Sequence, residues 1–274
     1  MTLQKIHWII LGLILACGLI LGIAVIGLHL TPWSMYVDPS EGYGISTMQG
    51  GLDTLILDTE FPKSPVSMPI YKIKSIDRVE EGIPEKAFTT KKSIPSADEA
   101  PALAEKGLKK YGGLPKDSQL VRAIPNYQYK YNLTTNTVEE QKSVSTQVIY
   151  HQILNGSEVI GGIINLHLGE NGEIIDILKI WPAYEYTGEV SIIPAELAYE
   201  KLMKGEAFKK PQGVISEDTK IIDIKLGYEV TGETGSYLKP VWIFYAKSPP
   251  RPTSPPSPYD STLFTLRVDA TQNP

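Results

Sequence analysis

The sequence predicts an α+β protein in which an N-terminal transmembrane helix precedes two tandem helix-plus-antiparallel-sheet modules. Three observations lead to this prediction. Residues 6–30 form one apolar run, strand-like segments dominate the remaining chain, and a helix start followed by strands occurs twice. The expected parts are an anchor at 1–31, an irregular leader with edge strands at 32–93, a first module at 94–190 and a second module at 191–274.

The apolar run from Ile6 to Leu30 contains no Asp, Glu, Lys or Arg. A helix of this length rises about 37 Å, enough to cross a hydrocarbon core about 30 Å thick. The run is longer than the apolar region of a cleaved signal peptide, and Cys17 lies in a poor lipobox. Because Lys5 precedes the run and no Lys or Arg follows until Lys63, we expect a single-pass cell-membrane protein with a cytoplasmic N-terminus. The lipid bilayer is then the partner of residues 6–30, and residues 31–274 lie outside the cytoplasm.

Composition limits the chemistry of the remaining chain. The formal net charge is −5, which argues against a nucleic-acid partner. The single cysteine, Cys17, lies in the apolar run, so residues 31–274 contain neither a disulfide nor a reactive thiol. Asn132-Leu133-Thr134 and Asn155-Gly156-Ser157 match the N-glycosylation acceptor pattern, which makes Asn132 and Asn155 candidate glycosylation sites.

The first module begins with a helix and continues as a meander. Ser96 and Glu99 have the spacing of a capping box, apolar residues then recur at helical spacing, and Gly112-Gly113 ends the run. Asn155-Gly156 and Asn171-Gly172 are hairpin signals between strand-like segments. The expected strands span residues 120–131, 144–154, 159–168 and 173–181.

The second module repeats this order. A short helix is expected from Pro194 to Gly205, and three strands follow at 220–230, 241–247 and 263–269. In the leader, Pro and Gly residues interrupt every helix, and the imperfect alternation over residues 70–76 is typical of an edge strand.

Three segments of the second module resemble the PepSY domain family and its membrane-anchored relatives, the YycH/YycI-type regulators. They are Pro194-Ala-Glu-Leu-Ala-Tyr199, the pair Leu226-Gly-Tyr228 and Leu238-Lys-Pro-Val-Trp-Ile-Phe244, and Phe264-Thr-Leu-Arg-Val-Asp-Ala270. The Thr-Gly that usually follows the last segment is replaced here by Thr271-Gln272. The similarity covers residues 190–270 and extends more loosely over 94–181. It implies a non-catalytic module that binds or restrains other proteins, with no catalytic residue to transfer.

The sequence indicates no catalytic, cofactor-binding or metal-binding residues. Beyond the apolar run only two histidines occur, and no Gly-x-Ser-x-Gly motif is present. A two-residue turn at Asn155-Gly156 would place His151 opposite Ile160 and His167 opposite Val144. The histidines would then lie about seven residues apart along the ladder, more than about 20 Å, too far to share a metal ion.

Aromatic residues are the candidate contact residues for a protein or a glycan. Tyr and Trp combine apolar area with a polar atom, although packing against the sheet also accounts for such residues. The candidates are Tyr127, Tyr129 and Tyr131, which alternate along one strand, together with Trp181, Tyr184, Tyr186 and Trp242.

The function that fits these features best is a membrane-anchored, extracytoplasmic protein-binding or regulatory module that acts on a protein partner at the cell surface. That partner would be a sensor, a protease or an envelope component. The alternatives are an envelope hydrolase of unrecognised type and a structural cell-envelope protein. An enzyme would bring a histidine and carboxylates together in a deep pocket, whereas a binding module would expose aromatic side chains or an unpaired strand edge.

Overall fold

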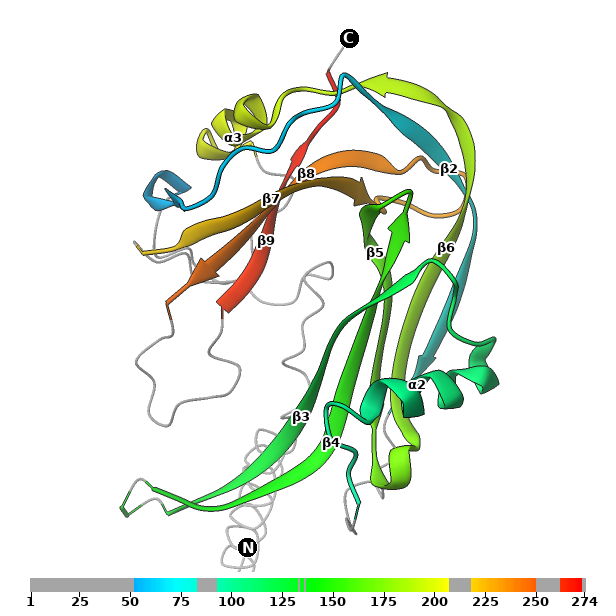
Figure 1. Ribbon diagram of the computed structural model, residues 1–274, viewed down its shortest axis with the longest axis vertical. Coiled ribbons are helices and arrows are strands. Elements are labelled where there is room, and N and C mark those ends of the chain that lie inside the picture. Colours follow the sequence, from blue (N-terminus) through cyan, green and yellow to red (C-terminus); the bar gives the residue numbers. More distant parts are fainter. Residues whose placement is uncertain are drawn as a thin grey trace, which may run out of the picture. The chain divides into compact units, whose positions relative to one another are not determined.

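A computed structural model describes residues 52–82, 93–132, 134–135, 137–206, 218–249 and 262–272, which all belong to one compact unit (Figure 1). The strands are β1 (Ile56–Leu57), β2 (Ser67–Glu81), β3 (Ser118–Asn132), β4 (Thr137–Leu154), β5 (Ser157–Leu168), β6 (Ile174–Ser191), β7 (Lys220–Glu229), β8 (Lys239–Ser248) and β9 (Thr262–Asp269). The helices are α2 (Ala100–Leu108) and α3 (Ala195–Met203), with short 3-10 helices η1 (Leu52–Thr54), η3 (Lys109–Tyr111) and η4 (Glu170–Gly172).

These nine strands form one mixed sheet, so the predicted fold of two tandem modules is wrong. The main order is β2-β6-β5-β7-β8-β9, with β4 on the other edge of β5, β3 beside β4, and β1 beside β7. The leader supplies two of the strands, because β2 pairs antiparallel with β6 and β1 pairs parallel with β7. Pairing between strands that are distant in the sequence thus joins the expected leader and the two expected modules into one sheet.

The sheet branches at β5, where the strand changes its neighbour. Val159 and Ile160 pair with Tyr228 and Glu229 of β7, whereas the residues from Ile163 onward pair with β6. Between the two stretches, Gly161 has a φ of +94°, a backbone conformation that side chains disfavour. A Cβ atom on Gly162 would lie 2.6 Å from Oε1 of Gln152. Two adjacent glycines therefore permit the change of partner.

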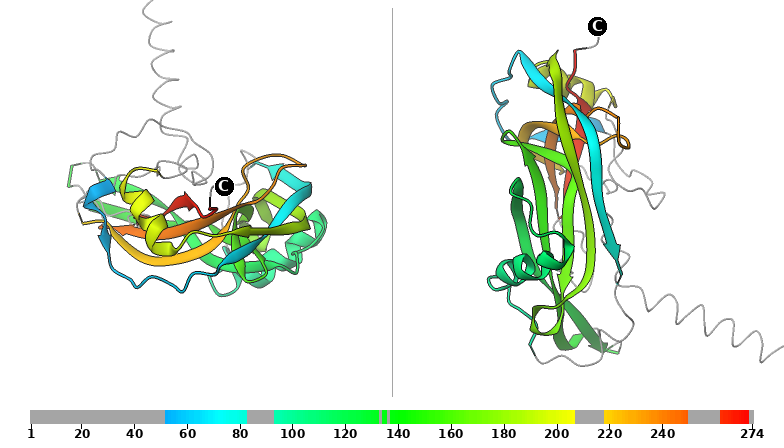
Figure 2. Two further views of the ribbon diagram at one scale, coloured as in Figure 1. Left: turned by 90° about the horizontal axis from the view of Figure 1, so that it is seen from above. Right: turned by 90° about the vertical axis from the view of Figure 1, so that its right-hand side faces the viewer.

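Both helices cover the same face of this sheet. The core at α2 contains Tyr150 and Leu166, and the core at α3 contains Val159 and Tyr228. Alternation along β4, which pairs with β5, places Tyr150 and Val159 on one face of the sheet. In the right-hand view of Figure 2, α2 lies against one side of the long strands. The opposite face, which we call the polar face, is covered by neither helix.

The predicted capping box, helix-ending glycine and hairpin turn are confirmed at the ends of helices and strands. The backbone N–H of Ser96 donates to Glu99 Oε2 at 3.0 Å, and that of Glu99 donates to Ser96 Oγ at 3.3 Å, which is the reciprocal pattern of a capping box. Gly112 follows η3 in the left-handed conformation. Asn155 and Gly156 both have positive φ, as a tight hairpin turn between β4 and β5 requires.

The prediction of a transmembrane anchor and a single-pass cell-membrane location is not supported. Within the described ranges no helix is long and apolar enough to cross a membrane. The two α-helices found there have nine residues each. The apolar run at 6–30, which carried that prediction, lies outside the described residues.

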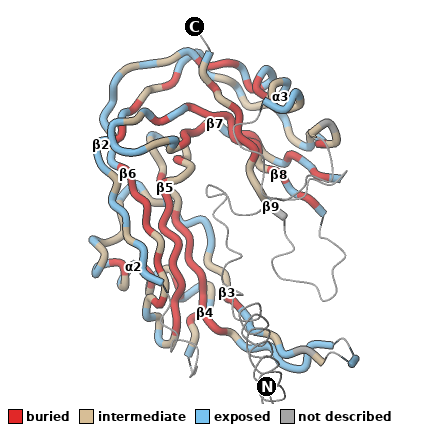
Figure 3. The backbone as a smooth tube through the Cα atoms, turned by 180° about the vertical axis from the view of Figure 1, so that it is seen from behind, coloured by how far each residue is buried: buried red, intermediate tan, exposed pale blue. Residues whose placement is uncertain are grey.

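The strands β3 and β4 extend beyond the rest of the sheet. The last pair that β4 forms with β5 joins Thr146 to Leu168, whereas β3 and β4 remain paired as far as Asn132 and Thr137. Figure 1 shows this end of β3 and β4 projecting past β5 and β6, and in Figure 3 it is largely exposed while the neighbouring central strands are buried. We call residues 127–132 and 137–143 the ribbon.

Candidate functional site

Most titratable and amide side chains that the sheet brings together lie on the polar face. Cross-strand partners share a face, so the register assigns each side chain to one side of the sheet. The polar face carries Asn126, Ser145, Gln147, His151, Glu158, Asn165, His167, Asp176, Lys225, Glu229, Tyr245 and Arg267. Three groups among them make direct contacts, and each group joins strands that are distant in the sequence.

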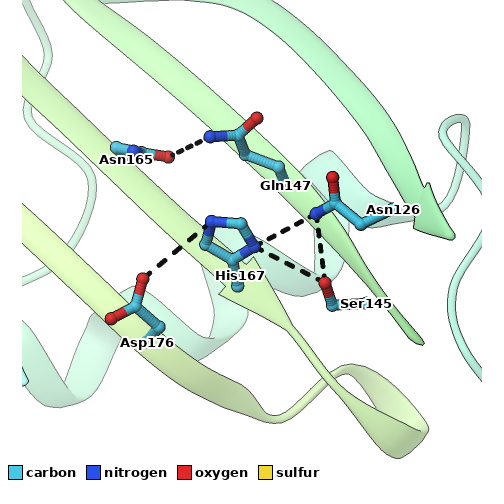
Figure 4. Close-up of polar contacts among 6 residues, drawn as sticks. All are labelled: Asn126, Ser145, Gln147, Asn165, His167 and Asp176. Carbon is cyan, nitrogen blue, oxygen red and sulfur yellow. Dashed lines mark hydrogen bonds and ion pairs between the residues drawn. The ribbon is translucent and has the colours of Figure 1, made fainter. Parts of the chain in front are cut away.

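The first group surrounds His167 (Figure 4). The amide nitrogen of Asn126 lies 3.2 Å from His167 Nδ1 and donates to Ser145 Oγ at 3.1 Å. Ser145 Oγ is 3.5 Å from the same ring nitrogen, and Asp176 Oδ2 is 3.9 Å from Nε2 on the opposite side of the ring. Since an amide nitrogen only donates, Nδ1 accepts and the ring proton resides on Nε2, facing Asp176. A serine, a histidine and an aspartate thus follow one another across β4, β5 and β6.

Burial sets the charges in this group. It lowers the pKa of His167 to about 4, so the imidazole is neutral at neutral pH. Burial, followed by the charge of Glu80, raises the pKa of Asp176 to about 6. The carboxylate therefore exists mainly above pH 6, and the imidazolium only below about pH 4. Because these ranges do not overlap, the contact between His167 and Asp176 is not an ion pair.

Access to the first group is limited. Ser145 is fully buried, and Asn126 and His167 are each 6% exposed. Gln147 and Asn165 lie beside them on the same strands, are also buried, and bond to each other at 3.0 Å. A row of mutually satisfied polar side chains rigidifies a sheet, and this accounts for the cluster without a reaction.

The second group centres on Glu158, where β4, β5, β7 and β8 meet. One carboxylate oxygen lies 2.5 Å from His151 Nδ1, and the other accepts a hydrogen bond from the hydroxyl of Tyr245. Lys225 Nζ lies 5.1 Å from the centre of the Tyr245 ring and 2.8 Å from Asp223. Each histidine of the described chain is thus held beside one carboxyl group.

The two histidines are closer than the sequence predicts. His151 lies opposite Ile163 and His167 opposite Gln147, so four residues separate them along the ladder instead of seven. The reason is the irregularity at Ile160–Gly162, which lengthens β5 relative to β4. The separation is about 13 Å along the strands, and both rings now lie on one face. This distance still excludes a shared metal ion, and among the described side chains no group of three or more His, Cys, Asp or Glu residues is arranged to hold one.

The third group is the pair Glu229 and Arg267, whose side chains are almost completely buried. Arg267 Nη1 lies 3.2 Å from Glu229 Oε1. Within the described part of the chain, neither Glu229 Oε2 nor Arg267 Nη1 has a hydrogen-bond partner. Buried charges of this kind cost desolvation energy, so the pair is a source of strain and not of stability.

The predicted aromatic contact residues fall into two classes. Trp181 and Trp242 are 8% and 1% exposed, and their indole N–H groups donate to Asp117 and to the carbonyl of Ile193. Tyr184 is half-buried and donates to Gln152. Trp181 and Trp242 therefore lie in the interior of the fold, whereas part of the Tyr184 side chain is exposed.

Of the other aromatic candidates, Tyr127 and Tyr186 are exposed and Tyr129 is half-buried. Tyr186 is 59% exposed and lies 6.1 Å from the Tyr71 ring. Tyr127 is 36% exposed, and its ring centre lies 6.3 Å from that of Tyr129, so this pair forms a small aromatic surface on the ribbon. The side chain of Tyr131 lies outside the described part of the structure.

Side-chain bonds fix the shape of the ribbon tip. Asn132 Oδ1 accepts from the backbone N–H groups of Thr134 and Thr135, and its amide donates to Glu139 at 2.9 Å. Lys130 also contacts Glu139, at 3.5 Å. Such an Asx turn presets the direction of the chain at a hairpin end. These bonds therefore set the direction of the chain at the tip of the ribbon.

The two candidate glycosylation sites differ in environment. Asn132 lies on the projecting ribbon, whereas the amide nitrogen of Asn155 donates to the hydroxyl of Tyr71 at 2.5 Å. The amide of Asn132 likewise donates to Glu139, at 2.9 Å, so both amides are engaged within the fold.

Sequence reasoning missed Glu158, Tyr245, Ser145, Asn126 and Asp176 as partners of the histidines. The contact between Glu158 and His151 is predictable from the sequence, because a tight turn at Asn155-Gly156 places Glu158 diagonally beside His151 on the neighbouring strand. The remaining residues come from strands whose pairing depends on the branch at β5, and the local sign of that branch is the glycine pair Gly161-Gly162 within the strand.

Neither a family model nor a curated protein matches the chain, so the resemblance to the PepSY family stays a prediction. Among solved structures, the chain is similar to an uncharacterized protein from Eubacterium rectale ATCC 33656, with a TM-score of 0.33 and 17% sequence identity. The match covers 68% of this chain and spans 57% of the length of that protein.

Proposed function

We propose that this chain is a non-catalytic protein-binding module and that the ribbon of β3 and β4 contacts its partner. The observation that carries the proposal is the length of the ribbon beyond the last pair between β4 and β5. A two-stranded ribbon is marginally stable on its own, so its projection from the sheet has no evident structural purpose.

The ribbon has the properties of a contact element. All six residues from Thr137 to Lys142 are exposed, including the apolar side chain of Val138, which is 45% exposed. The Asx turn at Asn132 holds the tip before any partner arrives, so little ordering entropy is lost on binding. Tyr127 and Tyr129 supply rigid aromatic area, the residue type that most often dominates binding energy.

The outer edge of β3 supports the same proposal. Among the described strands β3 pairs only with β4, and Leu120 and Val121 at its start are 44% and 48% exposed. Unpaired strand edges are common sites of protein recognition by strand addition. The PepSY resemblance implies a role of the same kind.

Site-specific photocrosslinking tests the proposal. A photoreactive amino acid replaces Tyr127 or Val138 in the full-length chain within its native cells, and the matched control carries it at Ile222, an exposed strand position away from the ribbon. The expected result is one reproducible crosslinked protein from the ribbon positions and none from Ile222. Identical products from all three positions, or no product from the ribbon, would overturn the proposal.

A second candidate, a hydrolase, is favoured by one observation: the order Ser145, His167 and Asp176 across the sheet. It ranks second because the serine is fully buried and its hydroxyl is 3.5 Å from the base. A fluorophosphonate probe separates the candidates, with Ser143→Ala as the control for Ser145→Ala. A binding module leaves the chain unlabelled, whereas labelling lost only in Ser145→Ala would replace the first proposal with the second.

A further inference from the structure

The junction between β5 and β7 is one of the two shortest strand pairings in the described sheet, the other being that of β1 with β7. Two residue pairs join these strands, whereas β5 shares six pairs with β6 and nine with β4. Gly227 of β7 lies so close to β5 that an added Cβ would be 2.7 Å from the carbonyl oxygen of Glu158. The strands β7, β8 and β9 therefore meet β5 through a short, glycine-lined contact. Further backbone bonds, outside this contact, join residues 235–238 to β2 and residues 270–272 to residues 191–193.

The helix-covered face of this junction is held by apolar packing. Tyr71, Val159 and Tyr228 belong to one buried core, and the rings of Tyr71 and Tyr228 meet edge to face at 5.6 Å. Backbone bonds add to this contact, because Leu238, just before β8, donates to Tyr71 of β2 at 2.9 Å. These contacts do not depend on the charge of any side chain.

The polar face of the same junction is held by polar side chains. Glu158 of β5 bonds to His151 of β4 through one oxygen and to Tyr245 of β8 through the other. The bond to Tyr245 is the direct side-chain connection from β5 to β8 on this face. The side chains of His151 and Glu158 are 29% and 17% exposed, so protons and water reach them.

We propose that His151, Glu158 and Tyr245 form a releasable latch between the two parts of the sheet. With the latch closed, β8 is fixed against β4 and β5 on the polar face. With it open, β7, β8 and β9 rotate about the apolar contacts of the other face, and the two parts separate at the polar face. The latch is independent of the partner-binding role proposed for the ribbon.

Acid is the expected release signal. The ionisable groups around Glu158 are His151 from β4, Tyr245 from β8, and Lys225 with its neighbour Asp223 from β7. Burial by itself raises the pKa of Glu158, but the hydrogen bond and charge of His151, the Tyr245 hydroxyl and the charge of Lys225 outweigh it, so the pKa is lowered. A carboxylate with a lowered folded pKa stabilises the fold above its unfolded pKa, and this contribution is lost as the pH falls through the folded value.

Distance measurement between two spin labels tests the latch. Labels on Val121→Cys in β3 and Leu263→Cys in β9 report the separation of the two parts, because both positions are exposed. Cys17 is replaced by serine in the full-length chain so that only these two thiols react. Tyr245→Phe removes a single oxygen from the latch, and Tyr237→Phe, at a tyrosine that is 52% exposed, is the matched control. Glu158→Gln is the second variant.

At pH 7.5 the wild type and Tyr237→Phe are expected to give one narrow distance peak. Tyr245→Phe and Glu158→Gln are expected to lose that single peak and to give longer, broader distances without unfolding. Acidifying the wild type should reproduce this change, whereas Glu158→Gln should respond less. Wild-type distances in both latch variants, or equal broadening in Tyr237→Phe, would overturn the latch. The measurement involves no partner, so its failure leaves the proposed binding function untouched.

Discussion

Replacing Gly162 by alanine tests whether the branch in β5 depends on a side-chain-free position. An alanine Cβ would lie 2.6 Å from Gln152 Oε1 and 2.8 Å from Gln152 Cβ. The second contact matters more, because a Cβ atom cannot swing away without moving its backbone. Gln152 must therefore shift as a whole.

The size of the effect follows from the bonds that Gln152 makes. Its amide donates to Asp117 at 2.7 Å and to the Pro182 carbonyl at 2.9 Å, and its oxygen accepts from Tyr184 at 2.8 Å. An intramolecular hydrogen bond contributes about 0.5–1.5 kcal/mol, and a buried group left unpaired costs about 1–3 kcal/mol. Loss of two of the three bonds should lower the free energy of unfolding by about 2–4 kcal/mol.

Urea unfolding of the full-length chain, followed by tryptophan fluorescence, measures this change. Gly82→Ala is the matched control, since nothing lies within 4 Å of its added Cβ. In a Gln152→Gly background the obstructing Cβ and amide are both absent, so Gly162→Ala should add little further loss. An unchanged midpoint for Gly162→Ala, or a loss that persists undiminished without Gln152, would refute the steric argument.

Two further predictions concern charged and titratable groups. Arg267→Met should lower the free energy of unfolding by about 3–5 kcal/mol because Glu229 becomes an unpaired buried charge. Adding Glu229→Met should recover most of the lost stability. If the Arg267→Met variant is as stable as the wild type in urea, the prediction is wrong. An NMR titration of the His167 ring should give a midpoint at about pH 4. Between pH 4 and 6.5 the folded state then binds fewer protons than the unfolded state, so acidification through this range should lower the free energy of unfolding by about 3 kcal/mol. His167→Gln should abolish this loss. An NMR midpoint near pH 6.5 would contradict the prediction.

Predictions that depend on neighbouring residues in the sequence succeeded. The capping box at Ser96 and Glu99 and the tight turn at Asn155-Gly156 are decided by a few adjacent side chains and by backbone preferences. The two α-helices, α2 and α3, are also those that the spacing of apolar residues predicts. At such positions the local preferences of the chain decide its conformation.

Predictions that depend on pairing between distant strands failed, whereas the antiparallel meander expected after the first helix is confirmed in β3, β4, β5 and β6. Residues 67–81 lack a clean alternation because β2 pairs along its whole length with β6 while part of its other edge bonds to residues 235–238. The long strands also exceed the expected segments, since β4 and β6 have eighteen residues each. A pairing partner more than a hundred residues away leaves no mark on local periodicity, so the sequence suggested modules where one sheet exists.

The candidate site could not be predicted from the sequence for the same reason. The polar side chains are scattered among apolar neighbours in seven strands, and each one alone resembles an ordinary half-buried strand residue. The irregularity at Ile160–Gly162 sets the register on both sides of the branch. A regular ladder would separate the histidines by seven residues and place them on opposite faces; the observed four place both on the polar face, His151 beside Glu158 and His167 beside Asp176. The branch at β5 therefore determines both the continuous sheet and the polar face, and substitutions at Gly161 or Gly162 should disturb the fold and the latch together.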